Sequence, residues 1–551
     1  MVNTERESND GGLPHAWLGM SIGTWVVLLL AGVLQALALA WPFEGGIKGD
    51  PMGWLQMVGL VVLAAVVDRS HSARQAAWQG WWFAWAWLLA STWWLFISLH
   101  VYGGMHEVLA ALAVMLLNAG VALYYALACY VYRWLCRDEL SVPWRALLFA
   151  GVWLLAELLR GTLFTGFPWG TIGYAHVEGW ARHWAPWIGV YGICAVLAFA
   201  AMWLGAKRQD RLTKPMGRIQ AAWVFGAVGA LTYAWVASPS QFGDTQTHVR
   251  LTVPVRVSLV QGNVPQDLKF GAGVVQSLRD YREALMNSTS DLVVLPETAL
   301  TLLPHQLPAG YWEPLVDRFA KGQQAALVGL PLTKENAVTG ERLYTNSTMA
   351  LLPQQASYRY DKYHLVPFGE FVPPFFRWFM NLWNMPLSDF GRGEMVQSAL
   401  SFAGQRIAPN ICFEDLFGEE IARNFADEDN APTLMVNMSN IAWFGNTVAI
   451  YQHLHISRMR AIEMNRPMLR ATNTGATAII NAQGVVTHRL PSAVKATLTA
   501  EVRGVEGAVT PYAQWVSAYG LWPLWLLGLG CVLGAGWVGY QARHGHRRFA
   551  P

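Results

Sequence analysis

The sequence predicts a polytopic α-helical membrane region, then one α/β domain, then a final membrane span. Of the 551 residues, 54% are apolar and 14% charged, whereas about a quarter of the residues in soluble domains are charged. Residues 1–240 contain 21 of the 29 tryptophans but only 26 charged residues. The net charge of +3 indicates no preference for nucleic acid or another acidic partner.

Eight apolar stretches are long enough, or nearly so, to cross a hydrocarbon layer of about 30 Å. They lie near 17–41, 53–67, 77–101, 107–132, 143–161, 186–206, 218–237 and 519–540. The second is short and is also compatible with a re-entrant segment. Ala36, Ala38 and Ala40 resemble a signal-peptidase site, but acidic residues dominate the N-terminus before them, unlike a signal peptide. We therefore expect seven spans within residues 1–240, the first of them uncleaved.

The distribution of lysine and arginine predicts the orientation, because these residues concentrate in cytoplasmic loops. With the N-terminus inside, the inside segments contain 14 Lys/Arg and the short outside loops contain three, Lys48, Arg160 and Arg182. This places the α/β domain outside. The eighth span and basic tail, residues 515–551, return the C-terminus to the inside. If the second stretch does not cross, basic loops fall on both sides.

Residues 250–505 have the size of one compact domain. Short β-rich runs alternate with helical patterns such as Val274–Asn287 and Ala449–Asn465, which predicts an α/β fold. Ser238–Thr247 is the predicted linker and Val505–Gln514 the return to the membrane. The predicted strands are Val255–Gln261, Asp291–Leu295, Ala325–Leu330, Thr345–Leu352, Arg406–Ile411, Thr433–Met438 and Ala476–Asn481.

Three reactive side chains stand at predicted strand ends. Cys412 is the only cysteine of the domain; a lone thiol is often just a small buried apolar side chain, but open α/β sheets bind ligands at carboxyl ends of strands. Glu297 follows an apolar run, where a buried carboxylate is unfavourable unless it is paired or takes part in function. The alternative is that Glu297 stabilises a helix N-terminus by complementing the helix dipole. Lys362 stands among aromatic and apolar neighbours, which favours a buried ammonium facing a carboxylate over a surface charge.

Seven motifs suggest a family. They are Val260-Gln-Gly-Asn-Val-Pro-Gln, Leu295-Pro-Glu-Thr-Ala, Lys362-Tyr-His-Leu-Val-Pro-Phe-Gly-Glu, Ile411-Cys-Phe-Glu, Trp443-Phe-Gly, Arg458-Met-Arg-Ala-Ile-Glu-Met-Asn-Arg-Pro and Arg470-Ala-Thr-Asn-Thr-Gly. With Glu, Lys and Cys at strand ends, they resemble the carbon–nitrogen hydrolase (nitrilase) superfamily and, with the spans, its membrane branch, the apolipoprotein N-acyltransferase family. The resemblance implies a nitrilase-like αββα sandwich on the periplasmic side of a bacterial inner membrane, with no cofactor.

The resemblance also implies roles for individual residues. Cys412 would be the nucleophile, Glu297 the general base and Lys362 the stabiliser of the tetrahedral intermediate, with Glu370 and Glu414 as supporting acids close to Lys362 and the thiol. The implied reaction moves a fatty acyl chain from a phospholipid to the N-terminal amine of a diacylglyceryl-modified apolipoprotein, through an acyl-thioester enzyme in the lipid bilayer.

Aromatic residues are candidates for substrate binding. Trp443 matches an aromatic near the family's substrate site. Phe270 and Phe413 stand where family members often carry Trp and Tyr, so we expect changes in lipid handling and not in reaction type. Ile441 replaces a frequent Asp beside Trp443. The outside loop that carries Trp169 is predicted to complete a lipid entrance; an interface anchor is the alternative.

The segment after Glu370 concentrates six aromatic residues within 371–387, among them Trp378. We expect an apolar arm at the lipid surface that admits acyl substrates; a core helix is the alternative.

The proposed chemistry needs a base, because a free thiol with a pKa near ~8.5 is mostly protonated at neutral pH. A partly desolvated Glu297 with a raised pKa would serve, and Lys362 with a backbone N–H near Phe413 would stabilise the oxyanion. His364 is a rival base. His453 and His455 face different sides of a predicted helix, so they predict packing or surface roles and no shared metal.

Two other functions stay open from the residues alone. One is a membrane-anchored amidase that releases the acyl group to water. The other is a transporter with an inactive outer domain. The membrane region offers few charged residues for a transport pathway, because Glu107, Glu157 and Arg160 lie near span ends, where long side chains reach water.

Overall fold

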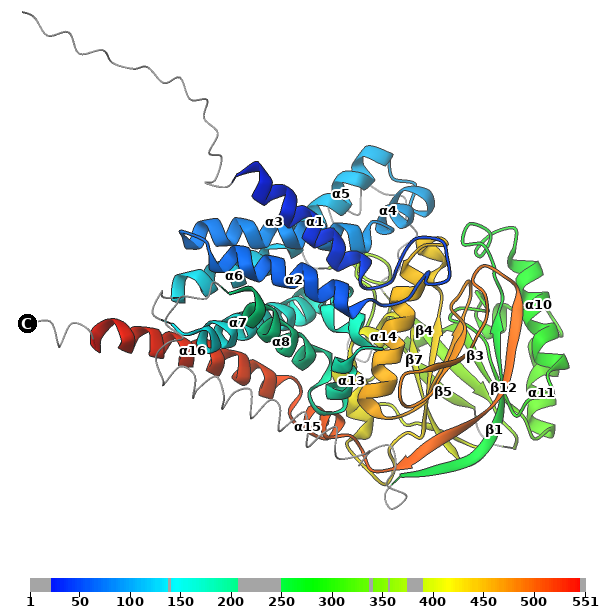
Figure 1. The fold of residues 1–551 in the computed structure, drawn as a ribbon. Coiled ribbons are helices and arrows are strands. Elements are labelled where there is room, and N and C mark those ends of the chain that lie inside the picture. Colours follow the sequence, from blue (N-terminus) through cyan, green and yellow to red (C-terminus); the bar gives the residue numbers. More distant parts are fainter. Residues whose placement is uncertain are drawn as a thin grey trace, which may run out of the picture.

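The computed structural model describes residues 21–136, 140–206, 249–335, 340–354, 357–373 and 390–545. Apolar helices form one side of the molecule, and a two-sheet α/β domain forms the other (Figure 1). The helices on the apolar side are α1 (Ile22–Leu37), α2 (Gly53–Asp68), α3 (Ala73–Thr92), α4 (Leu95–Ile97), η2 (Ser98–Tyr102), α5 (Glu107–Val121), α6 (Leu123–Leu135), α7 (Val142–Thr162), η3 (Leu163–Thr165), η4 (Ile172–His176), η5 (Trp180–Trp184), α8 (Ala185–Gly205) and α16 (Trp522–Gly545).

Several of these helices suit a membrane. Among the described residues, Glu107–Leu135, Val142–Thr165, Trp180–Gly205 and Trp522–Gln541 are long and apolar enough to cross one. The pair Ala73–Thr92 and Leu95–Tyr102, bent by 58°, would be a fifth. The helices α1 and α2 are apolar but shorter. The predicted span at 218–237 lies outside the described residues, so the total of eight stays a prediction.

Two charged residues of α7 form a buried pair. Arg160 Nη2 lies 2.7 Å from Glu157 Oε2, and both side chains are fully buried. Arg160 also donates to the carbonyl oxygens of Phe167 and Trp169, at 2.8 Å each. The expectation that these two residues reach water at a span end is therefore wrong, because the loop after α7 folds back over them and uses the guanidinium as its donor.

The α/β domain contains two six-stranded sheets, ordered β12-β1-β2-β3-β4-β5 and β11-β10-β9-β8-β7-β6. The inner pairs β1–β2–β3 and β7–β8–β9 are parallel, and the outer pairs are antiparallel. The strands are β1 (Val249–Gln261), β2 (Leu292–Val294), β3 (Ala325–Glu335), β4 (Arg342–Leu351), β5 (Tyr358–Asp361), β6 (Leu400–Phe402), β7 (Gln405–Ile411), β8 (Leu434–Ser439), β9 (Met468–Thr472), β10 (Ala478–Ile480), β11 (Val486–Arg489) and β12 (Ala496–Gly507).

The two sheets pack face to face, and helices cover their outer faces (Figure 1). Alternate residues of β2 show why: Leu292 and Val294 enter the core between the sheets, while Val293 packs under α10 (Val274–Asn287) and α11 (Trp312–Lys321). Side chains on opposite faces of one strand are thus both buried. With α14 on the other side, the layers follow the order αββα, which confirms the predicted sandwich.

Helix α14 (Ala449–Met464) lies between the second sheet and the membrane helices (Figure 1). Its polar side chains are buried on every side, among them Gln452, His453 and Arg460, because both neighbours cover it. Two 3-10 helices, η8 (Cys412–Leu416) and η10 (Ile441–Phe444), follow β7 and β8, and α15 (Pro511–Tyr519) leads from β12 to α16. The short elements η7 (Pro304–Gln306), α13 (Gly418–Ile421) and η9 (Ala422–Phe425) complete the domain.

Candidate active site

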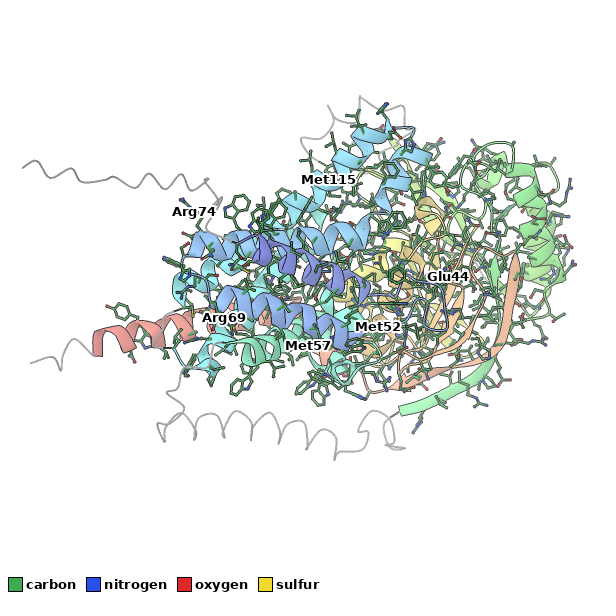
Figure 2. The ribbon with its side chains drawn as sticks, turned by 45° about the horizontal axis from the view of Figure 1, so that its top comes forward. Glu44, Met52, Met57, Arg69, Arg74 and Met115 are labelled. Atoms are coloured by element: carbon green, nitrogen blue, oxygen red, sulfur yellow. The ribbon has the colours of Figure 1, made fainter. Side chains whose placement is uncertain are left out.

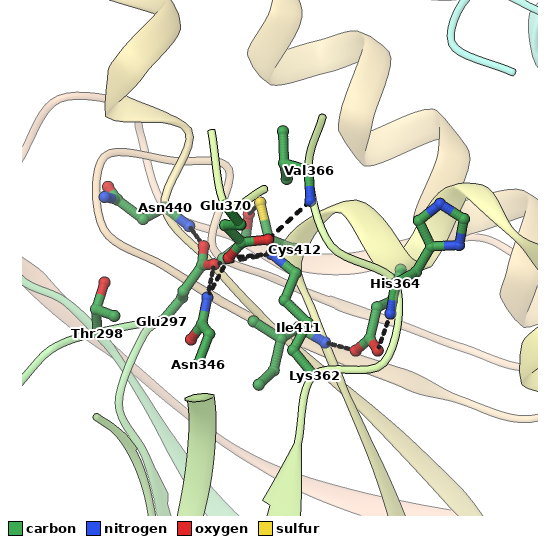
Figure 3. Close-up of polar contacts among 12 residues, drawn as sticks. Glu297, Thr298, Asn346, Lys362, His364, Val366, Glu370, Ile411, Cys412 and Asn440 are labelled. Atoms are coloured by element: carbon green, nitrogen blue, oxygen red, sulfur yellow. Dashed lines mark hydrogen bonds and ion pairs between the residues drawn. The ribbon is translucent and has the colours of Figure 1, made fainter. Parts of the chain in front are cut away.

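Three loops that follow strands bring the predicted catalytic residues together (Figure 3). Glu297 follows β2 of the first sheet, Lys362 directly follows β5 of the same sheet, and Cys412 directly follows β7 of the second. The Nζ of Lys362 lies 3.3 Å from Oε1 of Glu297, and both groups interact electrostatically with the Cys412 thiol. An acid, an amine and a thiol therefore share one buried site.

Glu297 is 7% exposed, and its carboxylate accepts hydrogen bonds at both oxygens. Asn346 Nδ2 donates to Oε1 at 2.7 Å and the Asn440 backbone N–H donates to Oε2 at 2.8 Å. Burial raises the pKa of Glu297, but Lys362, Lys269 and these donors outweigh burial, so the pKa lies below its usual value. The expected rise in pKa is therefore wrong, because two ammonium groups face this carboxylate.

Lys362 is shared by two carboxylates. Its Nζ lies 3.0 Å from Glu370 Oε1, and Asn346 Nδ2 bridges Glu297 and Glu370 at 2.7 and 2.8 Å. The second oxygen of Glu370 accepts the Val366 N–H at 2.8 Å. Burial lowers the pKa of Lys362, but Glu370 and Glu297 raise it above its usual value, so the buried ammonium stays charged.

Cys412 occupies a strained turn between β7 and η8. Its φ of 52° is left-handed, a conformation that costs a non-glycine residue about 1–3 kcal/mol. Ser439 Oγ lies 3.2 Å from the sulfur. Burial and the Glu297 charge raise the pKa of Cys412 to about 12, against the opposing effect of Lys362. The resting thiol is therefore protonated and needs a base as it attacks.

The sequence matches two family models. Residues 31–203 match the apolipoprotein N-acyltransferase N-terminal domain, and residues 256–510 match the carbon–nitrogen hydrolase domain. The apolipoprotein N-acyltransferase of Verminephrobacter eiseniae is 48% identical, with 90% of this chain and 92% of that protein covered. That of Ralstonia nicotianae is 43% identical, with 88% of each chain covered. This chain belongs to the apolipoprotein N-acyltransferase family.

Among solved structures, the C. elegans NitFhit protein is similar with a TM-score of 0.35 and 15% identity, over 50% of this chain and 65% of that one.

In this member of the N-acyltransferase family, Glu414 accepts hydrogen bonds from three backbone N–H groups and one hydroxyl, and Lys362 influences it only through its charge. Its oxygens accept the N–H groups of Tyr363 (2.7 Å), His364 (3.3 Å) and Ile411 (2.6 Å) and the Tyr360 hydroxyl (2.9 Å). Burial raises the pKa of Glu414 to about 7, although these donors and the charge of Lys362 oppose it. Glu414 thus joins the Lys362 loop to the end of β7.

Lys269 is a site residue that the sequence analysis did not identify. Its buried Nζ donates to the Glu297 carbonyl oxygen at 3.1 Å and to Thr298 Oγ1 at 2.8 Å. Burial lowers the pKa of Lys269 to about 8, although Glu297 and Cys412 raise it. The sequence signal was faint: a lysine three residues after the end of the motif that begins at Val260.

The three histidines lie in different surroundings. The His364 ring stacks on Phe417, its Nδ1 lies 2.9 Å from Glu420 Oε1, and it points away from Cys412 in Figure 3. His453 and His455 are buried in α14, which agrees with packing roles and not surface ones. Within the described ranges, no group of three or more His, Cys, Asp or Glu residues could hold a metal ion.

The aromatic candidates divide by exposure. Phe270 is exposed, Phe413 is buried, and Trp443 is half-buried with its ring nearly perpendicular to that of Tyr102. Trp169 is 2% exposed, so in this structure its ring contacts protein. Trp378 lies outside the described residues. The substrate-binding roles of all five candidates stay predictions.

Proposed function

We propose that this chain transfers a fatty acyl group from a phospholipid to the N-terminal amine of a diacylglyceryl-modified apolipoprotein, through a thioester on Cys412. The observation that supports this most directly is a thiol at a strand end that shares its site with an ion pair, in which Lys362 Nζ and Glu297 Oε1 are 3.3 Å apart. The domain that carries this site packs against apolar helices. Membership of the family supports the choice of substrates.

In the first half-reaction, the Cys412 sulfur attacks the ester carbonyl carbon of the phospholipid as Glu297 takes the thiol proton. Because the pKa of Cys412 is raised to about 12, proton transfer accompanies attack and no free thiolate accumulates. The oxyanion that forms is stabilised by Lys362 and the Phe413 N–H. When the intermediate collapses, the protonated Glu297 gives its proton to the leaving lysophospholipid oxygen.

The charges in the site explain why this proton transfer is feasible. At rest, Glu297 and Glu370 face Lys362 and Lys269, two negative groups against two positive ones. After attack, Glu297 is neutral and the oxyanion carries its charge, so the total is unchanged. The negative charge moves from one side of Lys362 to another, and the site needs no rearrangement to stabilise it.

In the second half-reaction, the acceptor amine attacks the thioester carbonyl carbon and the thiolate leaves. Glu297 takes a proton from the attacking nitrogen and returns it to the Cys412 sulfur. Glu370 keeps Lys362 in place, and Glu414 holds the loop that carries it. Phe270, Phe413 and Trp443, with Trp169 and the arm around Trp378, are proposed to bind acyl chains.

The α/β domain is proposed to lie on the periplasmic side of the inner membrane, with eight spans and both termini in the cytoplasm. Figure 2 supports this orientation: Arg69 and Arg74 lie at the end of the helical region away from the α/β domain, whereas Glu44 lies at the end beside it. Basic residues mark the cytoplasmic side, so the catalytic domain would be opposite.

The test is intact-mass spectrometry of the full chain after incubation with one defined phospholipid. We expect an added mass of one fatty acyl group that maps to Cys412, and its removal by a diacylglyceryl-cysteine peptide amine faster than by water. Cys412→Ala and Cys412→Ser should give no adduct while still inserting into the membrane. An active Cys412→Ala protein would disprove the mechanism, and preferential release to water would support the hydrolase instead.

A further inference from the structure

The carbonyl oxygen of Cys412 has two side-chain donors. His453 Nε2 and Asn437 Nδ2 each lie 3.3 Å from it. This carbonyl belongs to the same planar unit as the Phe413 N–H, and in a trans peptide the two groups point in opposite directions. Donors that hold the carbonyl therefore also hold the direction of the N–H that the proposed mechanism assigns to the oxyanion.

The partners of His453 determine which ring nitrogen carries the proton. Arg470 Nη2 lies 2.8 Å from Nδ1, and a guanidinium can only donate. Nδ1 is therefore an acceptor, and the proton is on Nε2, which faces Cys412. Asp415 Oδ2 lies 3.8 Å from Nε2, too far for a hydrogen bond. Burial, followed by the Arg470 charge, lowers the pKa of His453 well below its usual value, so the ring is neutral.

Arg470 orients both donors at once. Its Nη1 donates to Asn437 Oδ1 at 3.2 Å, so the Asn437 amide nitrogen is left to donate to Asn410 Oδ1 at 2.7 Å and to the Cys412 carbonyl. Arg470 is itself held by Asp415 Oδ2 at 3.3 Å and by Ser457 Oγ at 2.5 Å. All of these side chains are buried, so the network is shielded from bulk solvent.

Membrane-region residues fix the position of His453. The ring of Trp169, from the loop after α7, lies 5.4 Å from the His453 ring. Trp169 Nε1 and Trp94 Nε1 both donate to Gln452 Oε1, at 2.9 and 3.2 Å. Gln452 Nε2 donates to the carbonyl of Ser91 in α3 at 3.1 Å. The start of α14 is therefore attached to the helical region at the residue before His453.

We propose that His453 is a positioning residue for acyl transfer: from its place against Trp169, it holds the Cys412–Phe413 peptide so that the N–H points at the oxyanion. This inference rests on the proposed function of Cys412. Hydrogen bonds to a carbonyl also polarise its peptide and strengthen the N–H as a donor. Loss of His453 is expected to slow acylation about 10- to 100-fold, less than the about 10²–10³ lost with an oxyanion donor itself.

The experiment compares variants of the full chain in micelles with phosphatidylethanolamine. His453→Phe keeps a ring against Trp169 but removes the donor, whereas His453→Gln offers both a donor and an acceptor. His455→Phe is the matched control, because His455 is equally buried in α14 but binds the Gly49 carbonyl at 2.7 Å. The readouts are the acylation rate against phospholipid concentration, by intact mass, and the alkylation rate of Cys412 by iodoacetamide.

We expect His453→Phe to lower the maximal acylation rate with an unchanged half-saturating concentration and unchanged alkylation. His453→Gln should recover most of the rate, and His455→Phe should be close to the wild type. A wild-type rate in His453→Phe, an equal loss in His455→Phe, or a parallel loss of alkylation would each overturn the proposal.

A second measurement uses the wild-type chain, in case His453→Phe does not fold. The ¹⁵N NMR signals of the histidines, assigned with His453→Gln, should show a neutral His453 with its proton on Nε2 from pH 6 to 8. A proton on Nδ1, or titration in that range, would contradict the inference. Acylation that needs Cys412 but not His453 would leave the proposed function intact, whereas acylation of Cys412→Ala would remove both.

Discussion

Glu297 and Glu414 are buried carboxylates that both interact electrostatically with Lys362, yet their pKa values shift in opposite directions. Two lysines face Glu297, and its pKa lies below the usual value. Glu414 accepts four hydrogen bonds from uncharged groups, and its pKa is raised to about 7. The comparison indicates that two nearby ammonium groups keep a buried carboxylate ionised, whereas neutral donors together with the charge of Lys362 alone compensate burial only in part. The proposed roles follow this difference: proton transfer for Glu297 and positioning of the Lys362 loop for Glu414.

The strongest test of this division is Glu297→Gln. The amide cannot accept the thiol proton, so we expect acyl-enzyme formation to slow about 10³-fold, within the range for loss of a general base. Quenched-flow intact-mass measurement with a defined phospholipid gives this rate. Glu414→Gln is the matched control, the same change at an equally buried carboxyl, and should slow acylation far less. Equal losses in both variants would remove the distinction.

A second prediction concerns Lys269, whose charge lowers the pKa of Glu297. Lys269→Met should raise that pKa, so that Glu297 is protonated at higher pH and the acid limb of the rate profile moves upward. We expect a rate loss at acid pH that shrinks as the pH rises. Lys321→Met, at an exposed surface lysine, is the control. An unshifted acid limb would show that Lys362 alone sustains the Glu297 charge.

Much of the architecture was predictable because it depends on local patterns. Long apolar runs predicted the membrane helices, and continuous apolar runs predicted buried strands such as β2 and β8. Strand β12 was missed because its residues alternate between exposed and half-buried along much of its length, so it lacks a continuous apolar run. The burial of Glu157 and Arg160 was missed because it depends on a loop that folds back over α7.

The candidate site residues that could be predicted are those that stand in local sequence motifs. Glu297, Lys362 and Cys412 each stand in a recognisable motif at a strand end. The contribution of Lys269 to the low pKa of Glu297 was not predictable, because Lys269 is 28 residues away in the chain and meets the Glu297 backbone carbonyl only through the turn after β1. Arg470 likewise meets His453 and Asn437 only once the second sheet and α14 are packed together. Such contacts follow from topology and not from spacing.

A third prediction separates the positioning role of Glu414 from catalysis. Both carboxylate oxygens of Glu414 accept hydrogen bonds in the wild type, whereas glutamine offers one acceptor oxygen. Glu414→Gln should therefore destabilise the fold by about 1–3 kcal/mol and slow acylation only a few-fold.

The pH dependence of stability gives a signature of Glu414 itself. Because its folded pKa of about 7 exceeds the usual value near ~4.3, the native state binds a proton between these values that the unfolded state lacks. The contribution of Glu414 to stability therefore falls as the pH rises from about 4 to about 7. The Tm measured at pH 5 and pH 7.5 should differ less in Glu414→Gln than in the wild type. An unchanged difference would contradict the raised pKa.

The smallest expected effect belongs to the rival base. The His364 side chain pairs with Glu420 at 2.9 Å and stacks on Phe417, while only its backbone N–H contacts Glu414. His364→Ala should therefore leave the acylation rate within about twofold of the wild type across pH 6–8, since no proton of the reaction passes through the ring. Rates from the same quenched-flow measurement decide this. A loss as large as that of Glu297→Gln would make His364 the base and reduce Glu297 to a partner of Lys362, because a single thiol proton has only one first acceptor.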